Sequence, residues 1–402
     1  MPDRAISSAE VRRANRHRVL RLLSRHGAMA RADLCRESGL TGAGLSRIAR
    51  ELIDAGLLRE VSARAPAGSV GRPGASLAIR PDGAFVIGMA ISANRNAVVL
   101  MDAGQTLWEE EEVSVSFTEP EAALQTFADA ANRLARRCGI DRNRLIGIGL
   151  CIGAPAARAV SAEGYVTSPV LGWADVPVGP RIAAATGLPT RVVARAAALL
   201  QAEIQSAPQA QHESRFLINA GLGIGSASDF PGNAQGSAIA GLGCVSHLPC
   251  PGSDVVCACG RRGCLEQTAA GAAVVRLLDP LLDRPGLPFA ALNPALHQAL
   301  DRAAEGDPAA RAAFRTAGQR MAHGVDAVAA LLGPDRIILA GQTGRQPDYL
   351  AGVRQGLSAL ASPVAGNTLS VSTAKSAEAA ACVALENFVF SRQVDIARLK
   401  AA

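Results

Sequence analysis

Long apolar segments and targeting signals are absent from this sequence. No uninterrupted apolar run approaches the ~20 residues that a membrane-spanning helix requires. The first five residues, Met-Pro-Asp-Arg-Ala, lack the apolar core of a signal peptide. We therefore expect a cytoplasmic protein without a membrane partner. Hydrophobic residues make up 49% of the 402 positions and charged residues 19%, which is typical of globular proteins with two or three domains.

Cysteine is sparse, and its distribution does not fit a disulfide framework. Of the nine cysteines, three are clustered and six are scattered: Cys35, Cys138, Cys151, Cys244, Cys250 and Cys382. Scattered thiols are typical of a reducing compartment. Lysine is scarcer still, with only Lys375 and Lys400. Because arginine and alanine are both abundant, we attribute the bias to genome composition, and the arginine count alone indicates no function.

The clustered cysteines form a candidate metal site. The segment 247–264 contains four potential ligands: His247, Cys257, Cys259 and Cys264. Thiolate and imidazole are the donors that zinc prefers, and four of them complete its tetrahedron. Gly260 and Gly263 allow the loop to fold around one ion. The spacing is not that of a zinc finger, so we predict one structural zinc ion per chain. The alternative is a cysteine-rich loop with reduced, unliganded thiols.

Three helices are predicted near the N-terminus. Apolar periodicity marks one over residues 15–25 and a second over residues 31–38, which ends at a glycine. Thr41 is a candidate N-cap for a third helix that continues through residue 55. A helix, a short glycine-containing turn and a second helix form the helix-turn-helix motif, whose second helix enters the major groove of DNA.

Two strands complete a winged helix-turn-helix. Residues 57–61 and 76–79 flank a loop rich in glycine, proline and alanine, which we interpret as a wing. Five residues are candidate DNA contacts: Thr41, Ser46, Arg47, Arg50 and Arg72. Arg47 suits a bidentate contact with guanine, and Arg72 at the wing tip suits a narrow minor groove. The alternative for the whole unit is a helical protein-interaction module.

Positive charge is concentrated in this unit. Residues 1–80 hold 15 Arg and no Lys against 7 acidic residues, a formal charge of +8, whereas the whole chain carries +6, so residues 81–402 carry −2. A basic end on a near-neutral body favours a polyanionic partner. We therefore predict a DNA-binding domain over residues 1–80, which reads a double-stranded operator as part of a homodimer or homotetramer.

The pattern changes after residue 81. Residues 85–91, 97–101 and 106–109 read as consecutive strands, and a helix over 120–138 and a buried strand over 145–150 follow. A second unit of the same kind contains two further strands, near residues 216–220 and 335–340, each running into a glycine-rich turn. Strands and crossing helices repeated twice predict two α/β lobes with a cleft between them.

Four features together resemble the ROK family of repressors and sugar kinases. They are the cysteine loop, Gly221-Leu-Gly-Ile-Gly225, Ser168-Pro-Val-Leu-Gly-Trp173 and the winged helix-turn-helix. The resemblance implies an actin-like, ribonuclease-H-like ROK domain over residues 81–402. It also places the chain with the repressors, since the kinases lack the DNA-binding unit.

Departures from the kinase pattern indicate that the protein is not an enzyme. The kinases' first phosphate loop resembles Asp-x-Gly-Gly-Thr, but here the corresponding residues are Ala90-Ile-Ser-Ala-Asn94. Their Asn-Asp pair, which binds sugar and supplies the general base, aligns with Ala194 and Arg195. Arginine cannot accept a hydroxyl proton because its pKa stays above ~12. The sugar-gripping Glu before His247 is replaced by Cys244.

The remaining cleft residues suggest an altered ligand. Gly153, His247 and Glu266 resemble sugar-contacting positions, and Arg195 replaces a carboxylate with a guanidinium. A guanidinium fork suits phosphate or carboxylate, so we hypothesise a sugar phosphate or sugar acid as effector. The alternatives are an internal ion pair for Arg195 and an empty cleft. The glycines at 221, 223 and 225 resemble the second phosphate loop, but we expect the turn to require them whether or not nucleotide binds.

Three functions remain open. The leading one is a transcriptional regulator, in particular a repressor of carbohydrate-related genes, whose degenerate kinase-like domain senses an effector and oligomerises. The second is a sugar kinase with an autoregulatory DNA-binding domain. The third is a ligand-independent DNA-binding or scaffold protein.

Overall fold

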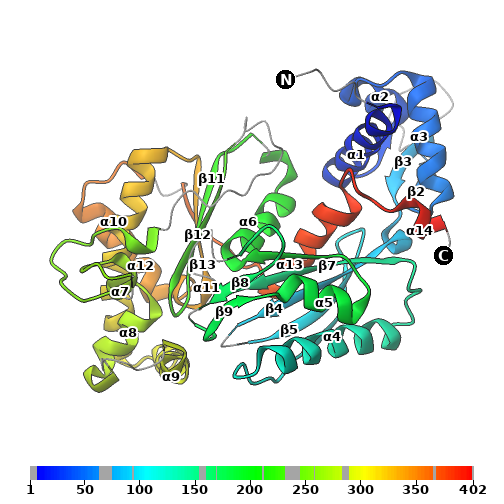
Figure 1. Ribbon diagram of the computed structural model, residues 1–402. Coiled ribbons are helices and arrows are strands. Elements are labelled where there is room, and N and C mark those ends of the chain that lie inside the picture. The colour runs from blue at the N-terminus through cyan, green and yellow to red at the C-terminus, as the bar shows by residue number, and fades with distance from the viewer. Residues whose placement is uncertain are drawn as a thin grey trace, which may run out of the picture.

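The protein consists of a small N-terminal helical unit and two larger α/β lobes, each built around its own sheet (Figure 1). The computed structural model describes residues 7–62, 75–92, 95–153, 160–168, 170–210, 212–230, 245–257, 259–282, 289–364 and 368–400. Within these ranges, no helix is both long and apolar enough to cross a bilayer. The predicted fold class, a winged helix-turn-helix followed by two α/β lobes, is confirmed.

The N-terminal unit has three helices and a three-stranded sheet. Its elements are α1 (Ser8–His26), β1 (Met29–Ala30), α2 (Arg31–Ser38), α3 (Gly42–Asp54), β2 (Leu58–Ser62) and β3 (Ala75–Ile79). Helix α1 begins earlier than predicted because Ser7 and Glu10 form a capping box. Thr41 caps α3 as predicted, and its hydroxyl accepts a hydrogen bond from the amide of Gly44 at 3.2 Å. Strands β2 and β3 pair antiparallel and confirm the strands of the wing.

The first lobe is built on a five-stranded sheet in the order β10-β7-β4-β5-β6. Its strands are β4 (Phe85–Ile91), β5 (Ala97–Asp102), β6 (Leu107–Glu112), β7 (Leu145–Ile152) and β10 (Thr190–Ala194). Every residue of β4 and β7 is buried because helices cover both faces. Helices α4 (Pro120–Arg137) and α5 (Val178–Thr186) pack on one face and α13 (Ser376–Ala384) on the other. A short hairpin of β8 (Val166–Ser168) and β9 (Trp173–Val176) adjoins the sheet.

The second lobe is built on a four-stranded sheet in the order β12-β11-β13-β14. Its strands are β11 (Arg215–Ala220), β12 (Ile224–Asp229), β13 (Arg336–Ala340) and β14 (Leu369–Val371). One face packs on a group of helices: α7 (Leu265–Ala269), α8 (Gly271–Leu278), α9 (Asn293–Ala304), α10 (Pro308–Leu332) and α12 (Pro347–Ala359). Helix α6 (Arg195–Ser206) covers the other face, and the short α11 (Gly341–Gly344) follows β13.

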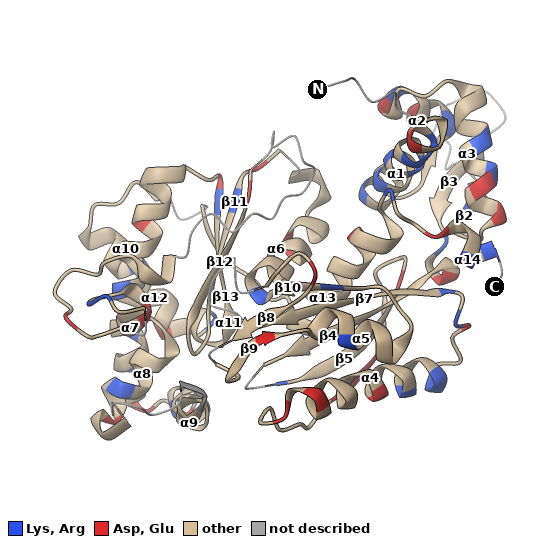
Figure 2. Ribbon diagram, viewed as in Figure 1, with Lys and Arg blue, Asp and Glu red and all other residues tan. Residues whose placement is uncertain are grey.

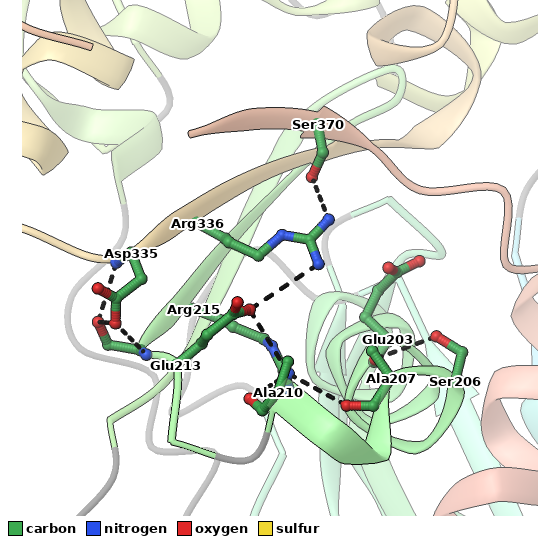
Figure 3. Close-up of polar contacts among 10 residues, drawn as sticks. Glu203, Ser206, Ala207, Ala210, Glu213, Arg215, Asp335, Arg336 and Ser370 are labelled. Carbon is green, nitrogen blue, oxygen red and sulfur yellow. Dashed lines mark hydrogen bonds and ion pairs between the residues drawn. The ribbon is translucent and has the colours of Figure 1, made fainter. Parts of the chain in front are cut away.

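A buried arginine holds the segment that follows the C-terminus of α6 against the second sheet (Figure 3). Arg215, the first residue of β11, is only 1% exposed. Its Nη2 donates to the carbonyl oxygens of Ala210 at 2.6 Å and Ala207 at 3.4 Å. Carbonyls at a helix C-terminus carry partial negative charge and lack intrahelical partners, so a guanidinium there is favourable. The carboxylate of Glu213 lies 3.9 Å from both Arg215 and Arg336.

Helix α13 connects the region between the lobes with the N-terminal unit. Glycines let it approach the first sheet closely: a Cβ at Gly149 would lie 1.9 Å from the carbonyl oxygen of Ala380. The helix continues into a π-helical turn, where Glu386 pairs with Arg21 of α1 at 3.3 Å. His17 Nδ1 lies 2.7 Å from the carbonyl oxygen of Phe390. The last helix, α14 (Ile396–Lys400), joins a hydrophobic cluster that runs from the N-terminal unit into both lobes.

Candidate functional site

Helix α3 presents a polar face to solvent. Thr41, Ser46, Arg47 and Arg50 are exposed, whereas Leu45, Ile48, Ala49 and Leu52 are buried in the N-terminal core. Among the described residues, Arg47 and Arg50 have no ion-pair partner within 4.0 Å. Helix α3 also contains two acidic residues. Glu51 faces α1, where its carboxylate lies 2.9 Å from Arg12 and 2.7 Å from Arg16, whereas Asp54, the last residue of the helix, is exposed. The outer face of α3 is therefore positively charged as far as Arg50, and the exposed carboxylate of Asp54 follows at its C-terminal end. The fifth predicted contact, Arg72, lies outside the described residues.

Four potential metal ligands meet beside the second lobe. The ligand atoms of His247, Cys257, Cys259 and Cys264 all lie within 4.8 Å of one another. Cys257 Sγ is 3.7 Å from His247 Nδ1, and Cys259 Sγ is 3.6 Å from Cys264 Sγ. Two thiolates bound at ~2.3 Å to one tetrahedral zinc ion are ~3.8 Å apart. The four residues together could therefore hold a metal ion such as zinc.

Backbone geometry shapes this loop. Gly263 has φ 68°, and a Cβ there would lie 2.3 Å from the carbonyl oxygen of Ser253, so only glycine fits. A hydrogen bond from the backbone of Arg261 lowers the pKa of Cys259 to about 7, which favours the thiolate that a metal binds. Cys250 is buried nearby but does not belong to the four-residue group. Cys244 lies outside the described residues.

A cavity of about 320 Å³ lies between the two lobes. The ends of β4 and β5 line it from the first lobe, and residues 221–225 and the start of α9 line it from the second. Among the residues predicted to bind an effector, Gly153, Arg195 and Glu266 line this cavity. His247 is not among the lining residues and lies instead beside Cys257. Glu266, which follows the cysteine loop directly, thus connects the potential metal site with the cavity.

Arg195 stands where β10 ends and α6 begins. Its Nη2 donates to the carbonyl oxygen of Ile91 at 3.1 Å, while its Nε is buried and has no hydrogen-bond partner among the described residues. Within the described residues, no carboxylate lies within 4.0 Å of its guanidinium. The predicted alternative of an internal ion pair for Arg195 is therefore wrong for the described part of the chain. Gly153 leaves the guanidinium accessible, since a Cβ there would lie 3.6 Å from Nη2.

The carboxylates that line the cavity are bound to other groups. Glu110 pairs with Arg95 at 3.2 Å and with Lys375 at 3.8 Å. Glu378 pairs with Lys375 at 3.1 Å. Glu266 Oε1 accepts a hydrogen bond from the amide of Ile224 at 3.1 Å, and burial raises the pKa of its carboxyl group. In the segment that stands in place of the kinases' first phosphate loop, residues 90–92 carry no carboxylate, and residues 93–94 lie outside the described ranges.

The glycine turn after β11 is open toward the cavity. Gly221 and Gly225 do not have left-handed backbone angles. A Cβ at Gly221 would approach only the carbonyl oxygen of Gly223, at 3.9 Å, and one at Gly225 would approach only Ala196 Cβ, at 3.7 Å. The expectation that the turn itself requires these two glycines is therefore wrong. Their lack of a side chain leaves space in the cavity instead.

Sequence reasoning missed one buried cavity residue, Asn293. It begins α9, is 5% exposed and lines the cavity, and neither its Oδ1 nor its Nδ2 has a hydrogen-bond partner in the part of the chain that the structure describes. The Asn-Pro dipeptide signals a helix start but carries no sign of a cleft, because the residue reaches the site only through the fold of the second lobe. Lys375 and Arg345, which line the cavity from late in the chain, were missed for the same reason.

A model of the ROK family matches residues 86–385, and a model of the MarR family matches residues 12–66. The chain belongs to the ROK family. A transcriptional regulator of Mycobacterium tuberculosis is 28% identical over 81% of this chain and 73% of that protein. The DNA-binding transcriptional repressor Mlc of Escherichia coli is 22% identical over 85% of this chain and 84% of its own length.

Solved structures agree on the fold. The crystal structure of a ROK family transcriptional regulator, a homologue of Escherichia coli Mlc, matches 98% of this chain and 100% of its own with a TM-score of 0.73 and 21% identity. A ROK family glucokinase from Streptomyces griseus, in complex with glucose and AMPPNP, matches 75% of this chain and 100% of its own with a TM-score of 0.61 and 20% identity. The fold is thus a winged helix-turn-helix followed by the two-lobed, actin-like ROK domain.

Proposed function

We propose that this protein is a DNA-binding transcriptional regulator that represses genes of carbohydrate metabolism. The observation that carries the proposal is the outer face of α3, where Ser46, Arg47 and Arg50 are exposed while α1 neutralises Glu51. In a helix-turn-helix this face enters the major groove, and arginine there can read guanine. The repressor names of the relatives support the sign of regulation, and the metabolic assignment follows from the ROK family.

The two parts of the chain divide the work in this proposal. Residues 1–80 bind the operator, and residues 81–402 sense an effector and assemble a homodimer or homotetramer in the cytoplasm. A symmetric dimer reads two half-sites separated by about one helical turn, roughly 34–36 Å, or a multiple of it. The contact of Glu386 and Phe390 with α1 provides a path by which the ROK domain influences the orientation of the DNA-binding unit.

A sugar kinase with an autoregulatory DNA-binding domain is the second candidate. The residues that line the cavity do not favour it. Transfer of a phosphoryl group to a sugar hydroxyl requires a group that accepts the hydroxyl proton. The position of that base holds Arg195, and Glu110, Glu266 and Glu378 are bound to cations or to a backbone amide. We therefore propose that the protein has no kinase activity.

We also propose that the loop 247–264 holds one structural zinc ion per chain, through His247, Cys257, Cys259 and Cys264. Four protein ligands leave no position open for a reactive water molecule, so the ion would stabilise the loop that carries Glu266. Elemental analysis of protein purified without chelator should give one zinc per chain. A stoichiometry near zero, with the thiols of Cys257, Cys259 and Cys264 open to titration, would instead favour the unliganded loop.

The regulator proposal is tested by selection from random duplexes. The full chain is incubated with a library of random double-stranded DNA, and the bound fraction is amplified and sequenced. We expect enrichment of a pseudo-palindrome whose half-sites lie a whole number of turns apart. Binding without any enriched sequence, or no binding at low salt, would contradict the proposal.

A further inference from the structure

We infer that the cavity between the lobes binds a small polyhydroxylated anion, with its carboxylate or phosphate at Arg195 and its hydroxyl groups at Asn293. This inference rests on the effector-sensing role proposed above and specifies the chemistry of that ligand. Two observations on the described residues carry it independently: a guanidinium without a carboxylate partner among them, and a buried amide without a hydrogen-bond partner among them.

The guanidinium of Arg195 is poised to bind an anion. It has five N–H donors. One on Nη2 donates to the carbonyl oxygen of Ile91, and the buried Nε has no acceptor within the described ranges. A carbonyl oxygen does not neutralise a cation, so the site retains a positive charge at the cavity wall. Carboxylate and phosphate match the planar fork of arginine and bind it through two parallel hydrogen bonds.

The backbone around Arg195 also favours negative charge. Arg195 is the first residue of α6, and no side chain caps this helix. The start of α13, at Ser376 and Ala377, lines the same cavity and is likewise uncapped. Partial positive charge at helix N-termini attracts anions. Gly153 and Gly225 leave room beside the guanidinium, because Cβ atoms there would meet only ordinary contacts, at 3.6 Å and 3.7 Å.

The other cations that line the cavity are paired with carboxylates or lie at its rim. Among the described residues, Arg195 is therefore the cation of the inner wall that has no carboxylate partner. Arg95 and Lys375 pair with Glu110, and Lys375 also pairs with Glu378. Arg345 lies at the exposed rim and donates to the carbonyl oxygen of Ala374. The carboxylate of Glu266 is bound to the amide of Ile224.

Asn293 requires a polar partner that the described part of the chain does not supply. A buried side-chain amide with neither oxygen nor nitrogen satisfied is rare in folded proteins, because each group loses its hydration without compensation. Gln342 lines the same cavity, and its Nε2 is also buried without a partner. Amide groups offer both donors and acceptors, as sugar hydroxyls do. The cavity volume of about 320 Å³ falls at the small end of ligand sites, which suits a single sugar-sized molecule.

Calorimetric titration of the full chain with matched ligands tests the inference. The probes are hexoses and pentoses, each compared with its phosphate ester and its aldonic acid, together with inorganic phosphate. We expect the charged member of at least one set to bind about tenfold or more tightly than the neutral sugar, since one good charge-assisted pair has roughly that effect. Tighter binding of the neutral sugars, or no binding by any anion including inorganic phosphate, would overturn the inference.

Variants then test whether Arg195 binds the anionic group of the ligand and Asn293 its hydroxyl groups. Arg195→Ala should abolish the preference for the charged member, and Arg195→Lys should retain part of it, while Arg181→Ala, at an exposed surface pair, serves as the matched control. Gly225→Ala adds a methyl group that the protein accommodates, so its melting temperature should stay unchanged while anion binding weakens. Asn293→Ala should weaken binding of a sugar phosphate but not of inorganic phosphate. Unchanged affinity in both Arg195 variants would refute the assignment.

The outcome is distinguishable from a failure of the proposed function. Binding of DNA without any preference for anions would overturn this inference and leave the regulator intact. Binding of an anion by a chain that recognises no DNA sequence would do the reverse.

Discussion

Helices α1 and α3 belong to the same small unit, and α1 carries six arginines and α3 two (Figure 2). The arginines of the two helices have different surroundings. Two of those on α1 are directed toward the protein: Arg16 pairs with Glu51 at 2.7 Å, and Arg21 pairs with Glu386 at 3.3 Å. Those of α3, Arg47 and Arg50, are exposed and have no ion-pair partner among the described residues. The net charge of the N-terminal unit therefore overstates the number of arginines available to DNA. The positions of the acidic residues decide which arginines remain unpaired.

The inward face of α1 also reaches both lobes. Glu386 belongs to the segment that continues α13, which packs on the first sheet, whereas Asp229 ends β12 of the second sheet. Burial raises the pKa of Asp229, while the nearby charges of Arg215, Arg21 and Arg25 oppose that shift. Helix α1 thus connects the DNA-binding unit to the body, and helix α3 faces away from it.

The largest effect on operator binding is expected at Arg47. Arg47→Ala should weaken operator binding by about 1–3 kcal/mol and relax the preference at one base position, because a bidentate contact with guanine is lost. Fluorescence anisotropy with the selected duplex and its single-base variants measures both quantities. Arg13→Ala, an exposed substitution on α1, is the control. Equal losses in the two variants would remove the distinction between the helices.

A substitution in the contact between α1 and the ROK domain should change the stability of the protein and leave its base preference unchanged. Glu386→Gln leaves Arg21 without its carboxylate in a largely buried contact, where both side chains are about one-fifth exposed, at 21% and 18%. We expect the free energy of unfolding to fall by about 1–3 kcal/mol, with base preference unchanged. Urea denaturation measures the first and the duplex panel the second. Glu37→Gln, in an exposed pair on α2, should have little effect on either.

A smaller effect is expected at Arg50, one turn after Arg47. Its position suits a contact with phosphate rather than with a base, so Arg50→Ala should weaken binding to all duplexes alike. The slope of log affinity against log salt should decrease by about one. Titrations at several salt concentrations would show this, and a changed base preference with an unchanged slope would indicate a base contact instead.

The smallest effect concerns pH at the junction between α1 and the body. Burial lowers the pKa of His17 below its ordinary value of 6.5, against the opposing effect of the Phe390 carbonyl. The unfolded chain therefore gains a proton at a higher pH than the folded chain, and stability should decrease as the pH falls through about 6.5. In His17→Gln this decrease should be smaller. Melting temperatures at about pH 7.5 and pH 5.5 measure it, and identical slopes for the two proteins would contradict the assignment.

The parts of the fold set by local pattern could be predicted from the sequence. Strand β4 and helix α2 have the predicted bounds, Phe85–Ile91 and Arg31–Ser38, because each is a clear apolar pattern between turn residues. Helix α1 was predicted too short, since its first turns have no apolar period and only the Ser7 capping box marks their start. The two-residue strand β1 carries no pattern at all.

The potential metal site and the cavity also differ in how far the sequence predicts them. The His247 and cysteine group could be predicted because its members are close in sequence and chemically distinctive. The cavity could be predicted only where a motif marked it, as at Arg195. Asn293 and Lys375 come from segments about 80 residues apart, and only the packing of the two lobes brings them to one cavity.

Photochemical cross-linking tests most directly whether α3, and not α1, reads DNA. A photoreactive phenylalanine analogue is placed at position 46 on α3 or at position 13 on α1, both exposed, and each protein is irradiated with the selected duplex. We predict cross-links from position 46 to bases inside the half-sites and few or none from position 13. Cross-linking from position 13 that equals or exceeds that from position 46 would contradict the proposal that this regulator reads its operator through α3.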